Sequence, residues 1–157
     1  MKKIWAPWRS KFIYDRKRKG CIFCMAKDSK SPKKSFIIKK TKHAFSMLNI
    51  YPYNNGHIMV SPKRHVSSLE KLSSDELQDI MELVNESTKA LTKTLKPDGY
   101  NIGANIGKIA GAGFPGHVHI HIVPRFSGDT NFMPVLNHTK VISESLDSLY
   151  DRLKKYA

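Results

Sequence analysis

The sequence has only two cysteines, few acidic residues and no long apolar run. Its 157 residues include 13 Asp and Glu against 27 Lys and Arg. No apolar stretch approaches the roughly 18–20 residues of a membrane-spanning helix, and Pro7 and Trp8 interrupt the start too early for a secretory signal peptide. We therefore expect a soluble, cytoplasmic protein with no membrane partner. Two thiols are also too few for a disulfide-rich secreted scaffold.

The shortage of acidic residues leaves a formal net charge of +14. Much of the positive charge falls in two basic runs, at residues 16–19 and 27–42. A positive field attracts anions, but it does not distinguish a nucleic acid from a nucleotide substrate. The runs lack the interleaved aromatic side chains on which single-stranded nucleic acids stack. We interpret most of these lysines as a solvated surface and do not expect a nucleic-acid partner.

The order of the predicted elements favours an α+β fold. Short apolar segments at 36–38, 44–48, 57–60, 100–105 and 117–123 predict five strands. A long helix begins at the capping box Ser73-x-x-Glu76, and its expected apolar stripe is Leu77, Ile80, Met81, Val84, Thr88, Leu91 and Leu95. A last helix carries Leu146, Leu149, Tyr150 and Leu153. Because short turns join antiparallel neighbours, we expect a mainly antiparallel five-stranded sheet with both helices packed on it.

The length fits one domain that spans residues 1–157. Residues 1–19 mix aromatic and cationic side chains without periodicity, and we interpret them as an N-terminal arm. The sequence contains no internal repeat.

The segment 116–125 is the only place where a reactive side chain recurs at a strict interval. His117, His119 and His121 alternate with apolar residues, which is typical of a strand whose side chains point to opposite faces in turn. The imidazoles would then lie about 6.5–7 Å apart on one face, at a rise of ~3.3 Å per residue. A lone histidine more often has a structural role. Three on one face, after the glycine-rich loop 107–113, favour chemistry on an extended ligand such as a polyphosphate.

These segments together resemble the histidine-triad (HIT) family. Residues 117–123 match its motif, His-apolar-His-apolar-His-apolar-apolar. Further similarity covers nearly the whole chain: Cys21-x-x-Cys24, residues 49–57, residues 61–65 and Asn105. Residues 5–9, 48–54 and 128–135 are similar to the bacterial branch that includes diadenosine tetraphosphate phosphorylases.

The resemblance implies a HIT-like fold and an enzyme that cleaves dinucleoside polyphosphates. His119 would attack the α-phosphorus to form a nucleotidyl-histidine, and His121 would face the leaving phosphate. An imidazole with an ordinary pKa of ~6.5 is mostly neutral at physiological pH, provided that its other nitrogen is held by an acceptor. We expect that acceptor to be a backbone carbonyl near residues 103–105 or in the glycine-rich loop.

Several residues are candidates for substrate binding. The resemblance assigns Asn49 to the ribose and places His57 beside the active site, although His57 fits the role of a satisfied core histidine equally well. Asn105 and backbone N–H groups of the loop, including Gly113, are candidates for the non-bridging phosphate oxygens. Lys108 and Arg125 are further candidates for charge contacts.

A second constellation comprises Cys21, Cys24, His65 and His117. Two thiolates two residues apart, with two distant imidazoles, fit a closed tetrahedral zinc site of the structural kind. In zinc-bearing members of the family, the first triad histidine is a ligand, together with a Cys pair and the histidine after the Pro-Lys-x segment. The alternative is a reduced Cys pair in a packed turn, with His117 contacting phosphate instead. No organic cofactor is expected.

One departure from the family concerns the acceptor. Hydrolase branches usually carry a Gln or Ser shortly before the triad, whereas this chain has Gly113-Phe114-Pro115-Gly116. Either backbone amides compensate for the missing donor, or the gap admits inorganic phosphate as the acceptor. The second option fits a phosphorylase that releases ADP and ATP, and the choice between water and phosphate stays open at this point. A hydrolase of dinucleotides or nucleoside phosphoramidates is the nearest alternative, and a non-catalytic nucleotide- or RNA-binding module is another. Because family members are commonly dimers, we expect a homodimer.

Overall fold

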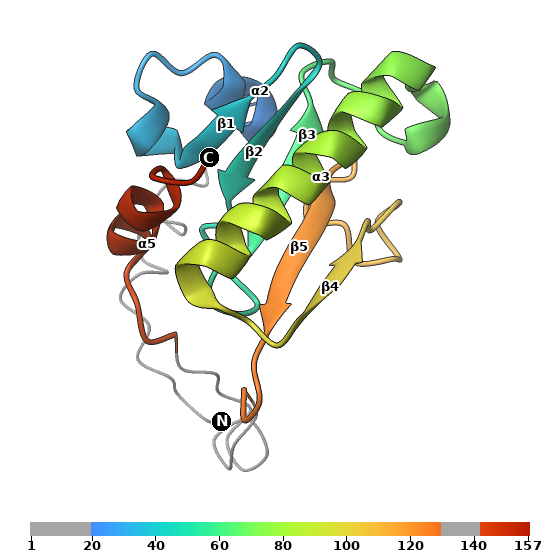
Figure 1. Ribbon diagram of the computed structural model, residues 1–157. Coiled ribbons are helices and arrows are strands. Elements are labelled where there is room, and N and C mark those ends of the chain that lie inside the picture. Colours follow the sequence, from blue (N-terminus) through green and yellow to red (C-terminus); the bar gives the residue numbers. More distant parts are fainter. Residues whose placement is uncertain (1–19, 130–141) are drawn as a thin grey trace, which may run out of the picture.

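A computed structural model describes residues 20–129 and 142–157. The N-terminal arm at 1–19 and most of the segment 128–135 lie outside the described residues. The described chain forms a five-stranded sheet in the order β1-β2-β3-β5-β4, and every neighbouring pair is antiparallel (Figure 1). The strands are β1 (Ile37–Lys40), β2 (Ala44–Leu48), β3 (Ile58–Pro62), β4 (Gly99–Gly103) and β5 (Ile120–Arg125). The predicted α+β fold with an antiparallel five-stranded sheet is confirmed.

Helices cover both faces of this sheet. The long helix α3 (Ser74–Leu95) crosses one face, and α5 (Leu146–Leu153) packs beside it (Figure 1). The short helix α2 (Ile22–Lys27) lies on the opposite face, where Phe23 is fully buried against residues of β1, β2 and β3. Two short 3-10 turns, Pro32–Ser35 and Leu69–Lys71, complete the described elements. None of the described helices is long and apolar enough to cross a membrane.

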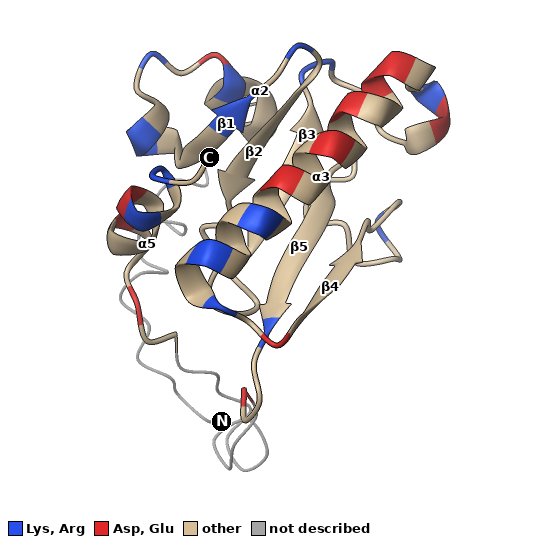
Figure 2. Cartoon of the chain, in the orientation of Figure 1, with Lys and Arg blue, Asp and Glu red and all other residues tan. Residues whose placement is uncertain are grey.

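Helix α3 begins at the predicted capping box. The Ser73 hydroxyl accepts a hydrogen bond from the Glu76 N–H, and the Glu76 carboxylate accepts one from the Ser73 N–H at 2.8 Å. Arg64 contacts the same carboxylate at 2.8 and 2.9 Å, and these bonds lower the pKa of Glu76 to about 2. Acidic side chains gather in the first half of α3 and basic ones in the second (Figure 2), an order that complements the helix dipole.

The predicted apolar stripe of α3 is partly wrong. Leu77 and Met81 are 38% and 50% exposed, whereas Leu83 and Ala90, which the stripe omits, are buried against the sheet. An apolar band wider than the contact with the sheet leaves one edge of α3 uncovered.

Only the second strand has the predicted bounds, and the third runs over residues 58–62 and not 57–60. The first strand starts at Ile37 because Phe36 has a left-handed backbone (φ 51°) that ends the preceding 3-10 turn. The fourth runs over residues 99–103 and not 100–105. The triad strand β5 begins only at Ile120, so two of the three histidines precede its ladder. Their stretch stays attached because the Val118 N–H donates to the Val66 carbonyl at 2.7 Å.

The turn before β3 meets the end of α3. Gly56 has φ +82°, and a Cβ added there would lie 2.6 Å from Leu95 Cδ1 and 3.0 Å from Leu91 Cδ2. Only glycine fits this backbone and this close approach. The contact fixes the position of the next residue, His57.

Candidate active site and metal site

The sheet places the triad histidines on the face that α2 covers. Ile120 and Ile122 pack into the core beneath α3, so the alternate side chains of β5 point toward α2. His119 and His121 are 5% and 9% exposed, and their rings lie 4.8 Å apart. As expected, histidines and core residues alternate along β5 and the residues just before it, with the two kinds of side chain on opposite faces.

The hydrogen bond of His119 fixes which of its nitrogens is free. Its Nδ1 lies 2.9 Å from the backbone carbonyl oxygen of His117. A carbonyl only accepts, so Nδ1 carries the proton and Nε2 keeps its lone pair. The prediction that the acceptor lies near residues 103–105 or in the loop is wrong, because the carbonyl two residues earlier is used. Burial lowers the pKa of His119, and its hydrogen bond to the carbonyl opposes that shift.

A chain of hydrogen bonds fixes the proton of His121 in the same way. His57 Nδ1 accepts from the Tyr53 N–H at 3.1 Å and faces Asn49 Nδ2 at 3.3 Å. The proton of neutral His57 is therefore on Nε2, which lies 2.9 Å from His121 Nδ1. His121 then accepts at Nδ1 and carries its own proton on Nε2.

Burial keeps this pair neutral. Burial, with the neighbouring histidines, lowers the pKa of His57 to about 3, and burial followed by the charge of His119 lowers that of His121 to about 4. At physiological pH, His121 is a neutral donor through Nε2–H.

Two aromatic side chains that the sequence did not assign to the site line these imidazoles. The Phe23 ring centroid lies 4.6 Å from that of His119, and the Tyr53 centroid lies 4.6 Å from that of His57. Tyr53 is 57% exposed, so its ring forms an open wall beside the pair. The available signals were the position of Phe23 between the two cysteines and that of Tyr53 four residues before His57.

Among the other predicted substrate-binding residues, a contact with the triad's hydrogen-bond chain is seen only for Asn49. Asn49 is buried beside His57, and its Oδ1 accepts from the Tyr51 N–H at 2.9 Å. Asn105 and Gly113 lie at the two ends of the glycine-rich loop, where Gly113 is exposed. Arg125 is engaged elsewhere, because its guanidinium contacts Asp129 at 2.6 Å and Asn101 at 2.8 Å.

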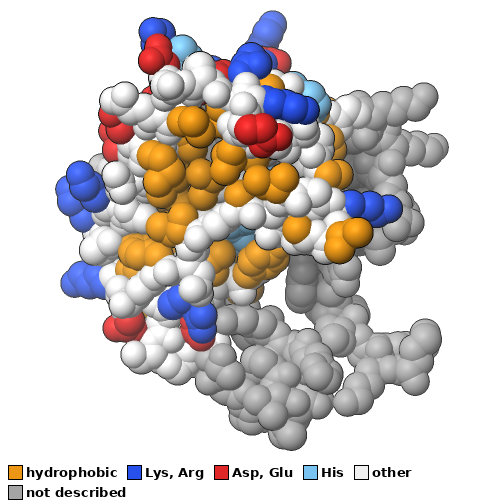
Figure 3. Space-filling model, turned by 90° about the vertical axis from the view of Figure 1, so that its right-hand side faces the viewer, with side chains coloured by type: hydrophobic (Ala, Val, Ile, Leu, Met, Phe, Trp, Pro, Cys, Tyr) orange, Lys and Arg blue, Asp and Glu red, His pale blue; other side chains and the backbone are white. Residues whose placement is uncertain are grey.

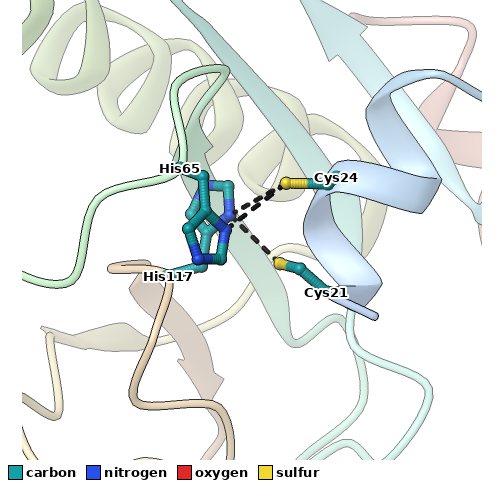
Figure 4. A group of neighbouring side chains, drawn as sticks. All are labelled: Cys21, Cys24, His65 and His117. Atoms are coloured by element: carbon teal, nitrogen blue, oxygen red, sulfur yellow. Dashed lines mark hydrogen bonds between the residues drawn. The ribbon is translucent and has the colours of Figure 1, made fainter. Parts of the chain in front are cut away.

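The four predicted metal ligands are brought together. Donor atoms of Cys21, Cys24, His65 and His117 all lie within 4.8 Å of one another (Figure 4). His117 Nδ1 is 3.2 Å from Cys21 Sγ and 3.7 Å from Cys24 Sγ, while His65 Nδ1 is 3.5 Å from Cys24 Sγ. This group could hold a metal ion.

The hydrogen bonding of His117 fits that role. Its Nε2 lies 2.9 Å from the Pro62 carbonyl oxygen, so Nε2 carries the proton and the Nδ1 lone pair faces the thiols. Two sulfur and two imidazole donors are a set typical of tetrahedral zinc sites. The cluster joins α2, the end of β3 and the approach to β5.

Comparison with known proteins gives consistent results. The HIT domain family model matches residues 30–128, more than half of the chain. A protein of Mycobacterium tuberculosis named AP-4-A phosphorylase is 31% identical over 154 residues, which cover 93% of this chain and 79% of that protein. An adenosine 5′-monophosphoramidase of Schizosaccharomyces pombe is 37% identical over 106 residues, covering 68% and 74%. A Zn-bound histidine triad family protein of Mycobacterium smegmatis superposes with a TM-score of 0.68 at 24% identity, over 87% and 92% of the two chains, and so shares the fold.

Proposed function

The chain belongs to the HIT domain family, as its triad motif predicts, and we propose that it is a nucleotidyl transferase that cleaves dinucleoside polyphosphates. The observation that carries this proposal is the free Nε2 lone pair of His119, held in place by the Nδ1–H bond to His117. Within the family, relatives named as a phosphorylase and as a phosphoramidase both act on nucleotides. The preferred reaction is the conversion of diadenosine tetraphosphate and inorganic phosphate to ADP and ATP.

In the first step, His119 Nε2 attacks an α-phosphorus and the bond to the bridging oxygen breaks. ATP leaves, and the adenylyl group stays on the imidazole. His121 donates its Nε2–H to the departing oxygen. In the second step, a phosphate oxygen attacks the same phosphorus, the P–N bond breaks, and ADP is released with His119 restored.

One feature favours a leaving group that departs as an anion, and a second favours inorganic phosphate as the acceptor. The His57–His121 pair is neutral, so it hydrogen-bonds to an anionic oxygen more readily than it supplies a full proton to an amine. In addition, no Gln or Ser side chain stands in the 113–116 segment, and Gly113 is exposed. A phosphoramidate hydrolase is the second candidate, supported by the relatedness to the yeast phosphoramidase.

We propose zinc as the ion for the four-donor cluster. Zinc there would be closed to substrate and would fasten α2 to the sheet, while the phosphate chemistry would remain with His119 and His121. Elemental analysis of protein purified without chelator tests this assignment. One zinc per chain is expected, and its absence would leave a reduced Cys pair.

The uncovered edge of α3 suggests a homodimer. Leu77 and Met81 on α3 and Ile102 on the edge strand β4 are 38–50% exposed. Figure 3 shows apolar side chains gathered over the side of the molecule where these elements lie. A second copy that pairs at β4 and covers this surface would remove both the apolar patch and the open strand edge.

Product analysis tests the reaction. Diadenosine tetraphosphate is incubated with and without inorganic phosphate, and the nucleotides are identified by mass. Phosphate-dependent ADP supports phosphorolysis, and AMP without phosphate indicates hydrolysis. No product, together with tight salt-sensitive RNA binding, would favour a binding module instead.

A second experiment tests the nucleophile. His119→Ala should abolish the adenylyl-enzyme seen by intact mass and reduce turnover to background, while the fold persists. His43→Ala is the matched control, because the Nε2 of His43 is buried without a hydrogen-bond partner among the described residues and lies outside the site. Undiminished turnover in His119→Ala would rule out the assignment.

A further inference from the structure

We propose that the metal site positions the nucleophile, with His117 and Phe23 as the two positioning residues. The inference rests on the proposed function for the identities of the metal and the nucleophile. It goes further in assigning the metal site a second role, which is control over the orientation of His119. Two separate contacts connect the cluster to that imidazole.

The first contact runs through His117. Its side chain is held at both nitrogens, with Nδ1 toward the thiols and Nε2–H on the Pro62 carbonyl. Its backbone carbonyl accepts the Nδ1–H of His119 at 2.9 Å. Because His117 is completely buried and fixed at its ring, the direction of its carbonyl depends on where the ring is held. An ion at Nδ1 would therefore set the acceptor that orients the nucleophile.

The second contact runs through Phe23, which lies between the two cysteines in sequence. Its ring is fully buried, with centroids 4.6 Å from His119 and 5.2 Å from His117. Helix α2 has six residues, of which only Phe23 and Ala26 are buried. A helix this short is not stable alone, so its attachment to the sheet depends on these two side chains and on the cysteine ligands.

Loss of the ion would loosen both contacts at once. The sulfur–nitrogen contacts of 3.2–3.7 Å that remain are weak hydrogen bonds. The main core beneath α3 lies on the other face of the sheet, so the global fold should persist. Because a misplacement of about 1 Å can slow an enzyme by roughly 100-fold, we expect adenylyl-enzyme formation to slow by about 10–100-fold.

Substrate-free measurements test this coupling. Long-range ¹H–¹⁵N NMR of the histidine side chains reports the tautomer of His119, and hydrogen exchange reports the order of residues 21–27. Both are compared in zinc-loaded protein and in wild-type protein depleted by chelator. The loaded form should show a single Nδ1–H tautomer and protected α2 amides. The depleted form should show an averaged tautomer and exchange in α2 at least 10-fold faster.

Variants separate the two contacts. Phe23→Leu should keep one zinc per chain but perturb the His119 signals, whereas Cys24→Ser should lose zinc and reproduce the depleted spectrum. Met25→Ala is the matched control on the same helix, because Met25 is 40% exposed. Unchanged His119 signals on zinc removal, or a chain that binds no zinc, would overturn the proposal. Since no readout needs substrate, failure of the proposed reaction would not alter this result.

Discussion

Replacement of His57 by leucine should both destabilise the protein and release the proton position of His121. His57 is 1% exposed, accepts from the Tyr53 N–H and donates to His121 Nδ1. Leucine has a similar volume but neither donor nor acceptor, so two partly or fully buried groups lose their partner. At roughly 1–3 kcal/mol for each of the two unsatisfied groups, the free energy of unfolding should fall by about 2–6 kcal/mol. In His57→Gln, whose side chain can both accept and donate hydrogen bonds, the free energy of unfolding should fall by only about 1 kcal/mol.

The chemical effect follows from the same bond. Without His57, neutral His121 can place its proton on either nitrogen and no longer presents Nε2–H to the leaving group at all times. A positioned proton donor contributes roughly 10²–10⁴-fold and the variant loses part of that contribution, so kcat of His57→Leu should fall by up to about 100-fold with a smaller change in KM. Urea unfolding, histidine NMR and the rate of ADP formation measure the three effects. An Nδ1–H tautomer at His121 in the wild type, or a leucine variant with wild-type stability and rate, would refute the reasoning.

Three further predictions concern the whole molecule. The free energy of unfolding should fall as the pH drops from about 6.5 toward 4. In the folded protein the histidine pair has pKa values of about 3 and about 4 and stays neutral, whereas the same histidines bind protons in the unfolded chain. An unchanged urea midpoint between pH 7 and pH 5 would contradict this. Gly56→Ala should lower the free energy of unfolding by about 2 kcal/mol or more, because residue 56 has a positive φ and the added Cβ would contact Leu95. Gly99→Ala should lower it far less in the same urea titration, because no atom lies within 4 Å of a Cβ added there. Met81→Glu with Ile102→Glu should convert a dimer to monomers in light scattering, and a wild-type monomer would contradict the proposed interface.

Much of the fold could be predicted because its signals are local. The capping box at Ser73 and the alternation around β5 depend on residues close together in sequence, and both are present in the structure. The exposed edge of α3 could not be predicted, because Leu77 and Met81 fit the helical period as well as the buried residues do. Periodicity identifies an apolar band but not how much of it one chain covers.

The candidate site was predictable in composition but not in connectivity. Spacing identified the row of three histidines and the Cys pair, and the resemblance to the HIT family then singled out His119, His57 and the four candidate metal ligands. The acceptor for His119 depends on a side-chain rotamer, and the approach of Phe23 depends on how α2 packs across the sheet. Residue spacing carries no information on either contact. We therefore expected a carbonyl near residues 103–105 or in the glycine-rich loop as the acceptor, whereas the structure uses that of His117, two residues before His119.

The use of that carbonyl has a genetic consequence. The group that orients the nucleophile belongs to the main chain, so no codon change at residue 117 can delete it. Substitutions there can only shift it, and they should give graded losses of activity instead of the complete loss expected at His119. A backbone ester introduced by chemical synthesis between residues 117 and 118 would weaken this acceptor without altering any side chain, although it would also remove the Val118 N–H that donates to the Val66 carbonyl.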